Sequence, residues 1–232
     1  MPRDLRPDSP PAAPAALFGV ATIAGLGAAV LALFLFGWLA DEMLEGDTLA
    51  FDLHVRAAVH AHASPGLTRL FVVVSDVGGP MVLAPLTVAL VGVFLWRRWW
   101  RGAVLLAVAV AGAGVLDAAL KHAFKRPRPT PFFGYALPSS FSFPSGHALL
   151  AFCFFIAAAA MLAPRLRRRE LRILVWGAAV LAIVSVGFSR IYLGVHYPSD
   201  VAGGYAAGLL WTGIVVAADR FAHAYARRRG GA

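Results

Sequence analysis

The sequence KHAFKRPRP at residues 121–129, followed by PSGH at 144–147 and SRIYLGVHYPSD at 189–200, organises the rest of the chain. Each stretch joins cations or histidines to a helix-breaking Pro or Gly, and each adjoins a long apolar segment. Proline lacks a backbone N–H and clashes with the preceding turn, so helices tend to begin or end at such stretches. The pattern is typical of a phosphate-binding site built at the ends of helices.

The composition of the 232 residues indicates a polytopic membrane protein. Hydrophobic residues make up 59% of the chain and charged residues only 14%, and the mean hydropathy is +0.72, which lies outside the range of soluble domains. The formal net charge of +9 does not indicate nucleic-acid binding, because the basic residues form short clusters between apolar runs, as membrane loops do. The single cysteine, Cys153, lies in an apolar run, which predicts a packing role.

Six apolar segments predict an all-α protein with six transmembrane helices. A helix rises about 1.5 Å per residue, so about 20 residues cross a hydrocarbon core of about 30 Å. The predicted spans cover residues 16–40, 70–96, 102–120, 147–163, 173–188 and 200–218, and the second is interrupted near Gly78-Gly79-Pro80. We expect one membrane domain over residues 16–218, between a disordered tail at 1–15 and a basic tail at 219–232.

The segment between the first two spans is polar and rich in histidine. Residues 51–59 predict a helix that lies at the membrane interface. His54, His60 and His62 resemble metal ligands at first sight, but no carboxylate or cysteine stands at a recognised ligand spacing with them. We therefore interpret them as interfacial or solvated histidines and expect no metal site.

The distribution of positive charge predicts the orientation of the protein. Two thirds of its 21 Lys and Arg residues lie on the side that holds both termini and the loops at 97–101 and 164–172. An excess of Lys and Arg marks the cytoplasmic face, so we expect both termini inside and the three motifs on the periplasmic or extracellular face of the cell (inner) membrane. Six spans in this order bring all three motifs to that face, where an anion-binding role explains their positive charge.

The first motif supplies two cations. Lys121 and Arg128 bracket a turn forced by Pro127 and Pro129. The planar fork of arginine matches two phosphate oxygens at once, whereas lysine supplies a compact point charge. The alternative is that these residues only extend to lipid headgroups. Asp117, four residues before Lys121, predicts a simple salt bridge to it.

The second and third motifs add a helix start and a histidine paired with a carboxylate. Ser145, Gly146 and His147 open the fourth span, where free N–H groups and the helix dipole attract an oxyanion; an ordinary N-cap is the alternative. His196 stands four residues before Asp200, and a carboxylate on one ring nitrogen leaves the other free to attack. Asp200 could equally be a favourable acid in the first turn of the sixth helix.

These residues suit phosphoryl transfer without a metal ion. Arg190 completes a set of three cations that can neutralise the equatorial oxygens of a transferring phosphoryl group. One histidine would attack phosphorus while the other protonates the leaving oxygen. The sequence offers no carboxylate cluster to hold Mg²⁺, so we predict no metal and no other cofactor.

The three motifs resemble the signature of the type 2 phosphatidic acid phosphatase and vanadium haloperoxidase superfamily. Lys-x6-Arg-Pro, Pro-Ser-Gly-His and Ser-Arg-x5-His-x3-Asp occur in order and unaltered, within residues 121–200. The resemblance implies that His196 is a nucleophile forming a phosphohistidine, that Asp200 orients it, and that His147 is the general acid that later activates water. It also implies that phosphate is bound by Lys121, Arg128, Ser145, Gly146 and Arg190.

The resemblance implies a membrane lipid phosphate as substrate: undecaprenyl pyrophosphate, phosphatidylglycerophosphate or phosphatidic acid. Of the three, undecaprenyl pyrophosphate is slightly favoured, because the extra cations Lys125 and Arg126 could hold a second phosphate, although interfacial charge is the simpler interpretation of these two residues. An aromatic loop beside the site suits a lipid whose tail stays in the bilayer, although it could equally be an interfacial belt; its aromatic residues are Phe132, Phe133, Tyr135, Phe141 and Phe143.

Two other functions stay open. A lipid phosphotransferase would pass the phosphoryl group to an alcohol instead of water. A lipid or anion transporter would use the charges to guide cargo, but transporters usually bury polar groups within their spans, whereas here they gather at one surface. No role is predicted for Asp76.

Overall fold

The computed structural model describes residues 15–135 and 139–230, and every regular element in these ranges is helical. The tail expected at residues 1–15 lies outside the described residues except for Ala15, which starts the first helix. The elements are α1 (Ala15–Glu45), α2 (Thr48–Ala61), α3 (Pro65–Val77), α4 (Pro80–Trp96), α5 (Trp100–Phe124), α6 (Gly146–Leu162), the 3-10 turn η1 (Ala163–Arg165), α7 (Arg169–Tyr192) and α8 (Pro198–Gly230). The predicted all-α class is confirmed.

The membrane-spanning helices agree with the predicted spans except at the second. Five helices are long and apolar enough to cross a membrane, and α3 and α4 together form a sixth candidate. The single helix expected over 70–96 is a pair bent by 40°, because Gly78 ends α3 and Pro80 starts α4. A Cβ on Gly78 would lie 2.1 Å from a methyl group of Val186 in α7, so the corner can approach α7 only through a glycine.

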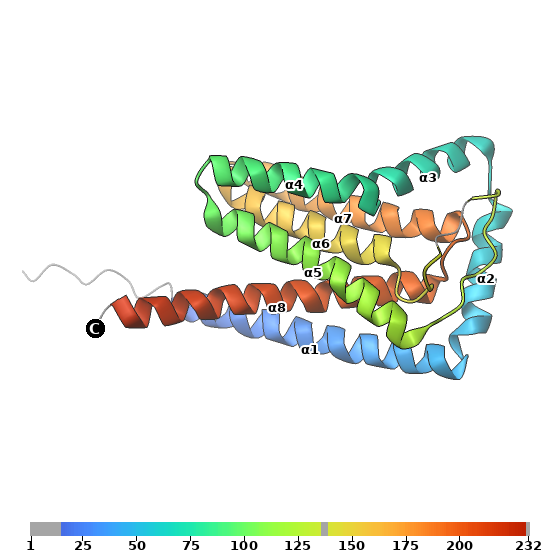
Figure 1. The fold of residues 1–232 in the computed structure, drawn as a ribbon, viewed down its shortest axis with the longest axis horizontal. Helices are drawn as coiled ribbons and strands as arrows, with labels where there is room; N and C mark the ends of the chain where they lie inside the picture. Colours follow the sequence, from blue (N-terminus) through green and yellow to red (C-terminus); the bar gives the residue numbers. More distant parts are fainter. Residues whose placement is uncertain (1–14, 136–138, 231–232) are drawn as a thin grey trace, which may run out of the picture.

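The hydrophobic core forms around α6, which α4, α5, α7 and α8 surround. Leu149, Ala151 and Cys153 of α6 are fully buried there, against side chains such as Leu106 of α5 and Val186 of α7. The packing role predicted for Cys153 is thereby confirmed. α1 lies along α8 on one side of the bundle (Figure 1).

The two ends of the bundle differ in the segments they carry. Both ends of the described chain lie at one end, together with the α4–α5 and α6–α7 connections (Figure 1). The helix expected at residues 51–59 forms as α2 and lies across the opposite end (Figure 1). α2 buries only Asp52 and Arg56, and it exposes the apolar Phe51 and Leu53. An exposed apolar face on a helix across the end of the bundle fits the interfacial position predicted for it.

Candidate active site

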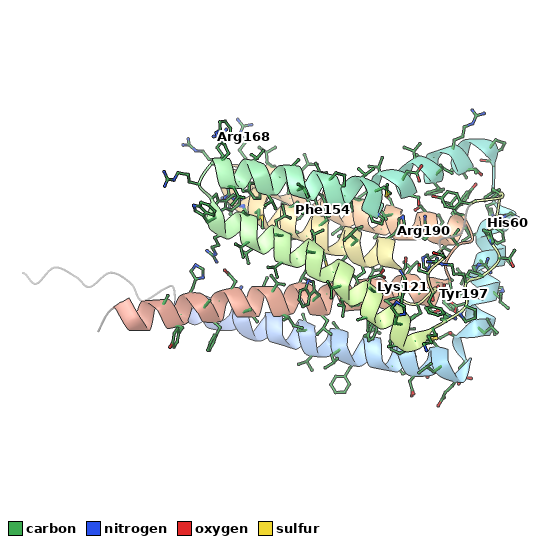
Figure 2. The ribbon with its side chains drawn as sticks, in the orientation of Figure 1. His60, Lys121, Phe154, Arg168, Arg190 and Tyr197 are labelled. Atoms are coloured by element: carbon green, nitrogen blue, oxygen red, sulfur yellow. The ribbon has the colours of Figure 1, made fainter. Side chains whose placement is uncertain are left out.

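The three motifs converge on one cavity at the α2 end of the bundle. The cavity has a volume of about 220 Å³ and is lined by α4, α5, α6, α7 and the connecting loops. Figure 2 shows Lys121, Arg190 and Tyr197 at this end and Arg168 at the other. The motif residues that line the cavity are Lys121, Arg128, Gly146, His147, Arg190 and His196.

His196 is buried, and each of its ring nitrogens has a different neighbour. Nδ1 lies 3.2 Å from the Asp200 carboxylate, and Nε2 lies 3.0 Å from the guanidinium of Arg128. A carboxylate accepts, so Nδ1 carries the proton and Nε2 keeps its lone pair. The intervening Pro198 starts α8 and does not prevent the pairing, because Asp200 lies in the first turn of that helix. Asp200 is therefore both an N-terminal acid and the partner of His196.

The ionisation of His196 is set mainly by burial. Burial lowers the pKa of His196 to about 4, and the hydrogen bond to Asp200 and its charge oppose that shift only in part, while Arg128 and Arg190 add to the lowering. Burial also lowers the pKa of Arg128, with a smaller contribution from Arg190. His196 is consequently a neutral imidazole at physiological pH.

Lys121 forms the predicted salt bridge with Asp117, with 2.7 Å between Nζ and a carboxylate oxygen. The other oxygen of Asp117 is buried and has no hydrogen-bond partner, and Asp117 lines the cavity. A Cβ on Gly146 would lie 2.8 Å from both Asp117 oxygens. Only glycine at 146 therefore leaves room for this carboxylate beside the start of α6.

Ser145 is fully buried, and its side chain does not form the N-cap that was the alternative to an anion-binding role. Its hydroxyl caps no backbone N–H of α6 and has no hydrogen-bond partner. Its backbone N–H donates instead to the carbonyl oxygen of Asp200 at 2.9 Å. This bond ties the start of α6 to the start of α8, so the second and third motifs are joined through their backbones.

Arg190 is buried deep in the bundle, with only 1% of its surface exposed. Its guanidinium donates to the hydroxyl of Ser75 and lies 5.6 Å from the ring centroid of Tyr135. The hydroxyl of Tyr135 donates in turn to Asp76 at 3.1 Å. Asp76, for which the sequence predicts no role, thus anchors a loop tyrosine beside a motif arginine.

Arg126 corrects the interpretation of the extra cations. Arg126 is not an interfacial residue, because only 8% of its surface is exposed. Its guanidinium does not line the cavity but donates to the carboxylates of Asp52 at 2.8 Å and Asp200 at 2.7 Å. The physical reason is the left-handed Lys125 (φ 51°), which ends α5 and turns the chain. Of the two extra cations, only Lys125 is exposed, so only Lys125 fits the interpretation as an interfacial charge.

Asp52, Ser142 and Ser199 are buried polar residues around the Arg126–Asp200 pair, and the sequence did not predict a role for them. Ser142 donates to the Asp200 carboxylate at 2.5 Å. The only sequence signal for Asp52 is its i, i+4 spacing to Arg56, which puts both on one face of a helix. That spacing does not reveal that this face is turned toward the protein.

The aromatic loop is divided between packing roles. Phe143 is fully buried and contacts Phe36 and Phe124, with ring centroids 5.7 and 5.1 Å away. It is a core residue, which corrects the expectation that it belongs to a substrate-facing or interfacial belt. Phe132 stacks on His60 with centroids 4.0 Å apart.

Within the described ranges no three His, Cys, Asp or Glu side chains are grouped as a metal site.

Comparison with known proteins gives consistent results. A model of the PAP2 superfamily matches residues 102–223. Phosphatidylglycerophosphatase B of Bacillus subtilis is 34% identical over 180 residues, which cover 69% of this chain and 87% of that protein. Lipid A 1-phosphatase of Rhizobium etli is 39% identical over 120 residues, or 47% of this chain and 46% of that protein. The crystal structure of a transmembrane PAP2 type phosphatidylglycerolphosphate phosphatase from Bacillus subtilis aligns with a TM-score of 0.75 and 31% identity, covering 83% of this chain and 96% of that one.

Proposed function

This chain belongs to the PAP2 superfamily and is a multi-pass membrane lipid phosphatase, and we propose that it hydrolyses a glycerolipid phosphate monoester through a phosphohistidine intermediate without a metal ion. The observation that carries the proposal is the pair of contacts that His196 makes through its two ring nitrogens. Its Nδ1 is paired with a buried carboxylate, which leaves the lone pair on Nε2 at a cavity lined by cations. That is the arrangement of an activated nucleophile beside an anion site.

In the first step, Nε2 of His196 attacks phosphorus and the bond from phosphorus to the alkoxy oxygen breaks. His147, at the start of α6, is protonated while the negatively charged phosphate occupies the cavity beside it, and it gives this proton to the leaving oxygen. Lys121, Arg128 and Arg190 neutralise the charge on the phosphoryl oxygens. Because Arg128 now donates to Nε2, its guanidinium must transfer to a phosphate oxygen before the attack.

In the second step, His147 takes a proton from water, and the water oxygen attacks the phosphohistidine. The bond between phosphorus and Nε2 breaks, inorganic phosphate leaves, and neutral His196 is restored. Asp200 keeps its hydrogen bond to Nδ1 throughout and stabilises the positive charge that the ring gains while it carries the phosphoryl group. Both histidines therefore finish the cycle in their starting states.

The cavity supports a monoester over a pyrophosphate as the substrate. Arg126 is bonded to two carboxylates away from the cavity, so it is not available for a second phosphate. Asp117 places a carboxylate in the cavity wall, which would repel the additional negative charge of a pyrophosphate. We therefore rank phosphatidylglycerophosphate first, phosphatidic acid second and undecaprenyl pyrophosphate third.

The active site is proposed to face the periplasm or cell exterior, with both termini in the cytoplasm. The arginines of the α6–α7 connection lie at the end of the bundle opposite the site, as Arg168 shows (Figure 2). A site at the end of the bundle lets a lipid present its phosphate at the membrane surface while its acyl chains remain in the bilayer.

The test is phosphate release in detergent with EDTA from the three candidate lipids, comparing the native chain with His196→Ala. We expect release that survives EDTA, falls by at least about 1,000-fold in the variant, and is fastest with phosphatidylglycerophosphate. Loss of activity in EDTA would refute metal independence. Phosphorylated alcohol formed only when an acceptor is added would indicate a phosphotransferase, and lipid flux in proteoliposomes without hydrolysis would indicate a transporter.

A further inference from the structure

A buried polar chain connects α2 to the proposed catalytic carboxylate. Asp52 on α2 and Asp200 on α8 are both 0% exposed, and Arg126 and Ser199 between them are 8% and 3% exposed. Asp52, Arg126 and Ser199 do not line the cavity. They therefore have no direct contact with a bound phosphate, and the mechanism above assigns them no task.

The geometry of this chain is fixed from several directions. The two terminal nitrogens of Arg126 divide between the carboxylates, with Nη2 donating to Asp52 at 2.8 Å and Nη1 donating to Asp200 at 2.7 Å. Asp52 also accepts from the backbone N–H of Ser199 at 2.9 Å and from its hydroxyl at 2.5 Å. The Tyr197 ring lies 4.1 Å from the guanidinium carbon of Arg126. Each charged group has partners, as buried charges require.

The two oxygens of Asp200 have different partners. Oδ1 accepts from Arg126, whereas Oδ2 faces Nδ1 of His196 and accepts from the Ser142 hydroxyl and the backbone N–H of Tyr197. Arg126 thus holds the carboxylate by one oxygen and leaves the other for the histidine. Rotation of Asp200 away from His196 would break the bond to Arg126.

The charges explain why a second carboxylate is needed. An arginine paired with Asp200 alone would neutralise it and weaken its support for a positively charged imidazole. Asp52 supplies a second negative charge to the same guanidinium, so Asp52, Arg126 and Asp200 together retain one negative charge. That charge remains available to His196 while Nε2 carries the phosphoryl group. The buried Arg56 nearby donates instead to the backbone carbonyl oxygens of Thr130 and Gly194.

We propose that Asp52 and Arg126 are positioning residues for the reaction: they hold Asp200 on Nδ1 of His196 and keep its negative charge available to the ring. The proposal rests on the proposed function, in which His196 is the nucleophile. It makes α2 part of the catalytic centre, although α2 contributes nothing to the cavity wall. The alternative is that Asp52 and Arg126 only hold α2 against the rest of the protein, and the test must distinguish this role from positioning.

The test compares Asp52→Asn, Arg126→Gln and the double variant by phosphate release from phosphatidylglycerophosphate. Asp52→Asn keeps the shape but leaves Asp200 neutralised by Arg126, so we expect kcat to fall by about 10- to 100-fold, as for other groups that orient a functional histidine. KM and inhibition by inorganic phosphate should change by less than about 2-fold, because phosphate binds to other residues. Asp47→Asn removes the same charge from an exposed position just before α2 and should match the native chain.

The double variant decides between positioning and docking. It removes one charge of each sign and restores the single negative charge beside His196, so its kcat should exceed that of Asp52→Asn and lie within about 10-fold of native. A docking role predicts a double variant at least as impaired as the worse single variant, and that result would overturn the proposal. Native kcat in Asp52→Asn would overturn it as well.

Two further measurements distinguish a loss of activity from a loss of folding and separate the positioning role from the proposed function. Thermal unfolding of each variant in detergent reports whether it is folded. If Asp52→Asn cannot be purified, the double variant is compared with Arg126→Gln and with the native chain, and a kcat no higher than that of Arg126→Gln overturns the proposal. His196→Ala in the same assay separates the two proposals. Activity that persists in His196→Ala refutes the proposed function, whereas an inactive His196→Ala beside a fully active Asp52→Asn refutes only the positioning role.

Discussion

The two ends of the helix bundle carry positive charge in opposite ways. At the site end, Lys121, Arg126 and Arg190 are 8%, 8% and 1% exposed. At the other end, the arginines in and beside the α4–α5 and α6–α7 connections are exposed, including those in the first turns of α5 and α7; they are Arg97, Arg98, Arg101, Arg165, Arg167, Arg168, Arg169 and Arg172. Most motif cations are thus buried with partners at the site end, where Lys125 is an exposed exception, whereas these arginines are exposed at the other end.

The partners explain the difference. Arg101 at the solvated end pairs with Asp219, with 54% of the arginine side chain exposed, and the guanidinium carbon of Arg165 lies 3.5 Å from the ring centroid of Trp99. Such contacts suit an interface with lipid headgroups and contribute little individually to stability. Buried arginines need hydrogen bonds and countercharges, and that requirement gives the site end its defined geometry.

The largest expected difference between the two ends concerns Arg190. Arg190→Gln removes a buried cation from the proposed phosphate-binding cavity, so we expect kcat/KM for phosphatidylglycerophosphate to fall by about 100- to 1,000-fold. Arg168→Gln at the opposite end is the matched control and should stay within about 2-fold of native. Similar losses in both variants, measured by phosphate release on folded protein, would show that the division between the ends is wrong.

A smaller effect is expected from the acidic residues. Asp117→Asn removes the carboxylate that lines the cavity, so hydrolysis of undecaprenyl pyrophosphate relative to phosphatidylglycerophosphate should rise by about 10-fold, equivalent to about 1.4 kcal/mol. Asp219→Asn, which breaks the exposed pair at the other end, should leave that ratio unchanged. An unchanged ratio in Asp117→Asn would show that this carboxylate does not select against a second phosphate.

The smallest effect concerns stability and pH. Because burial lowers the pKa of His196 from 6.5 to about 4, the unfolded chain binds a proton at this residue over that pH range while the folded chain does not. Lowering the pH through this range therefore reduces the contribution of His196 to the folding stability of the native chain. The variant His196→Gln has no such titrating group and loses no stability from this source. The difference in Tm between them should shift in favour of the variant between pH 6.5 and 4, measured by thermal unfolding in detergent. A difference independent of pH would contradict the neutral buried histidine.

Much of the site could be predicted from the sequence because its residues stand at fixed spacings beside helix ends. The salt bridge from Lys121 to Asp117 follows from the i, i+4 spacing. The approach of Asp200 to His196 follows from a similar separation, although Pro198 hid its geometry. Convergence of the motifs follows from the number and order of spans.

Other contacts could not be predicted because they join residues far apart in sequence. Asp52 and Arg126 are 74 positions apart, and Asp52 and Ser199 are 147 positions apart. Interfacial charge was a reasonable prediction for both Lys125 and Arg126, yet the left-handed turn at Lys125 separates them. The sequence also left open whether Ser145 caps α6, and only the structure shows that its hydroxyl makes no such bond.

The sequence by itself determined the helical class, the membrane setting and the three motifs, because apolar length and local spacing act within one helix or turn. Only the tertiary structure decided which cations face the cavity and which support the carboxylate behind it. That choice depends on which buried charges find countercharges when distant helices pack, and no local pattern contains it. Arg126 and Arg128 show this, since they stand two residues apart and face opposite sides of the same histidine–carboxylate pair.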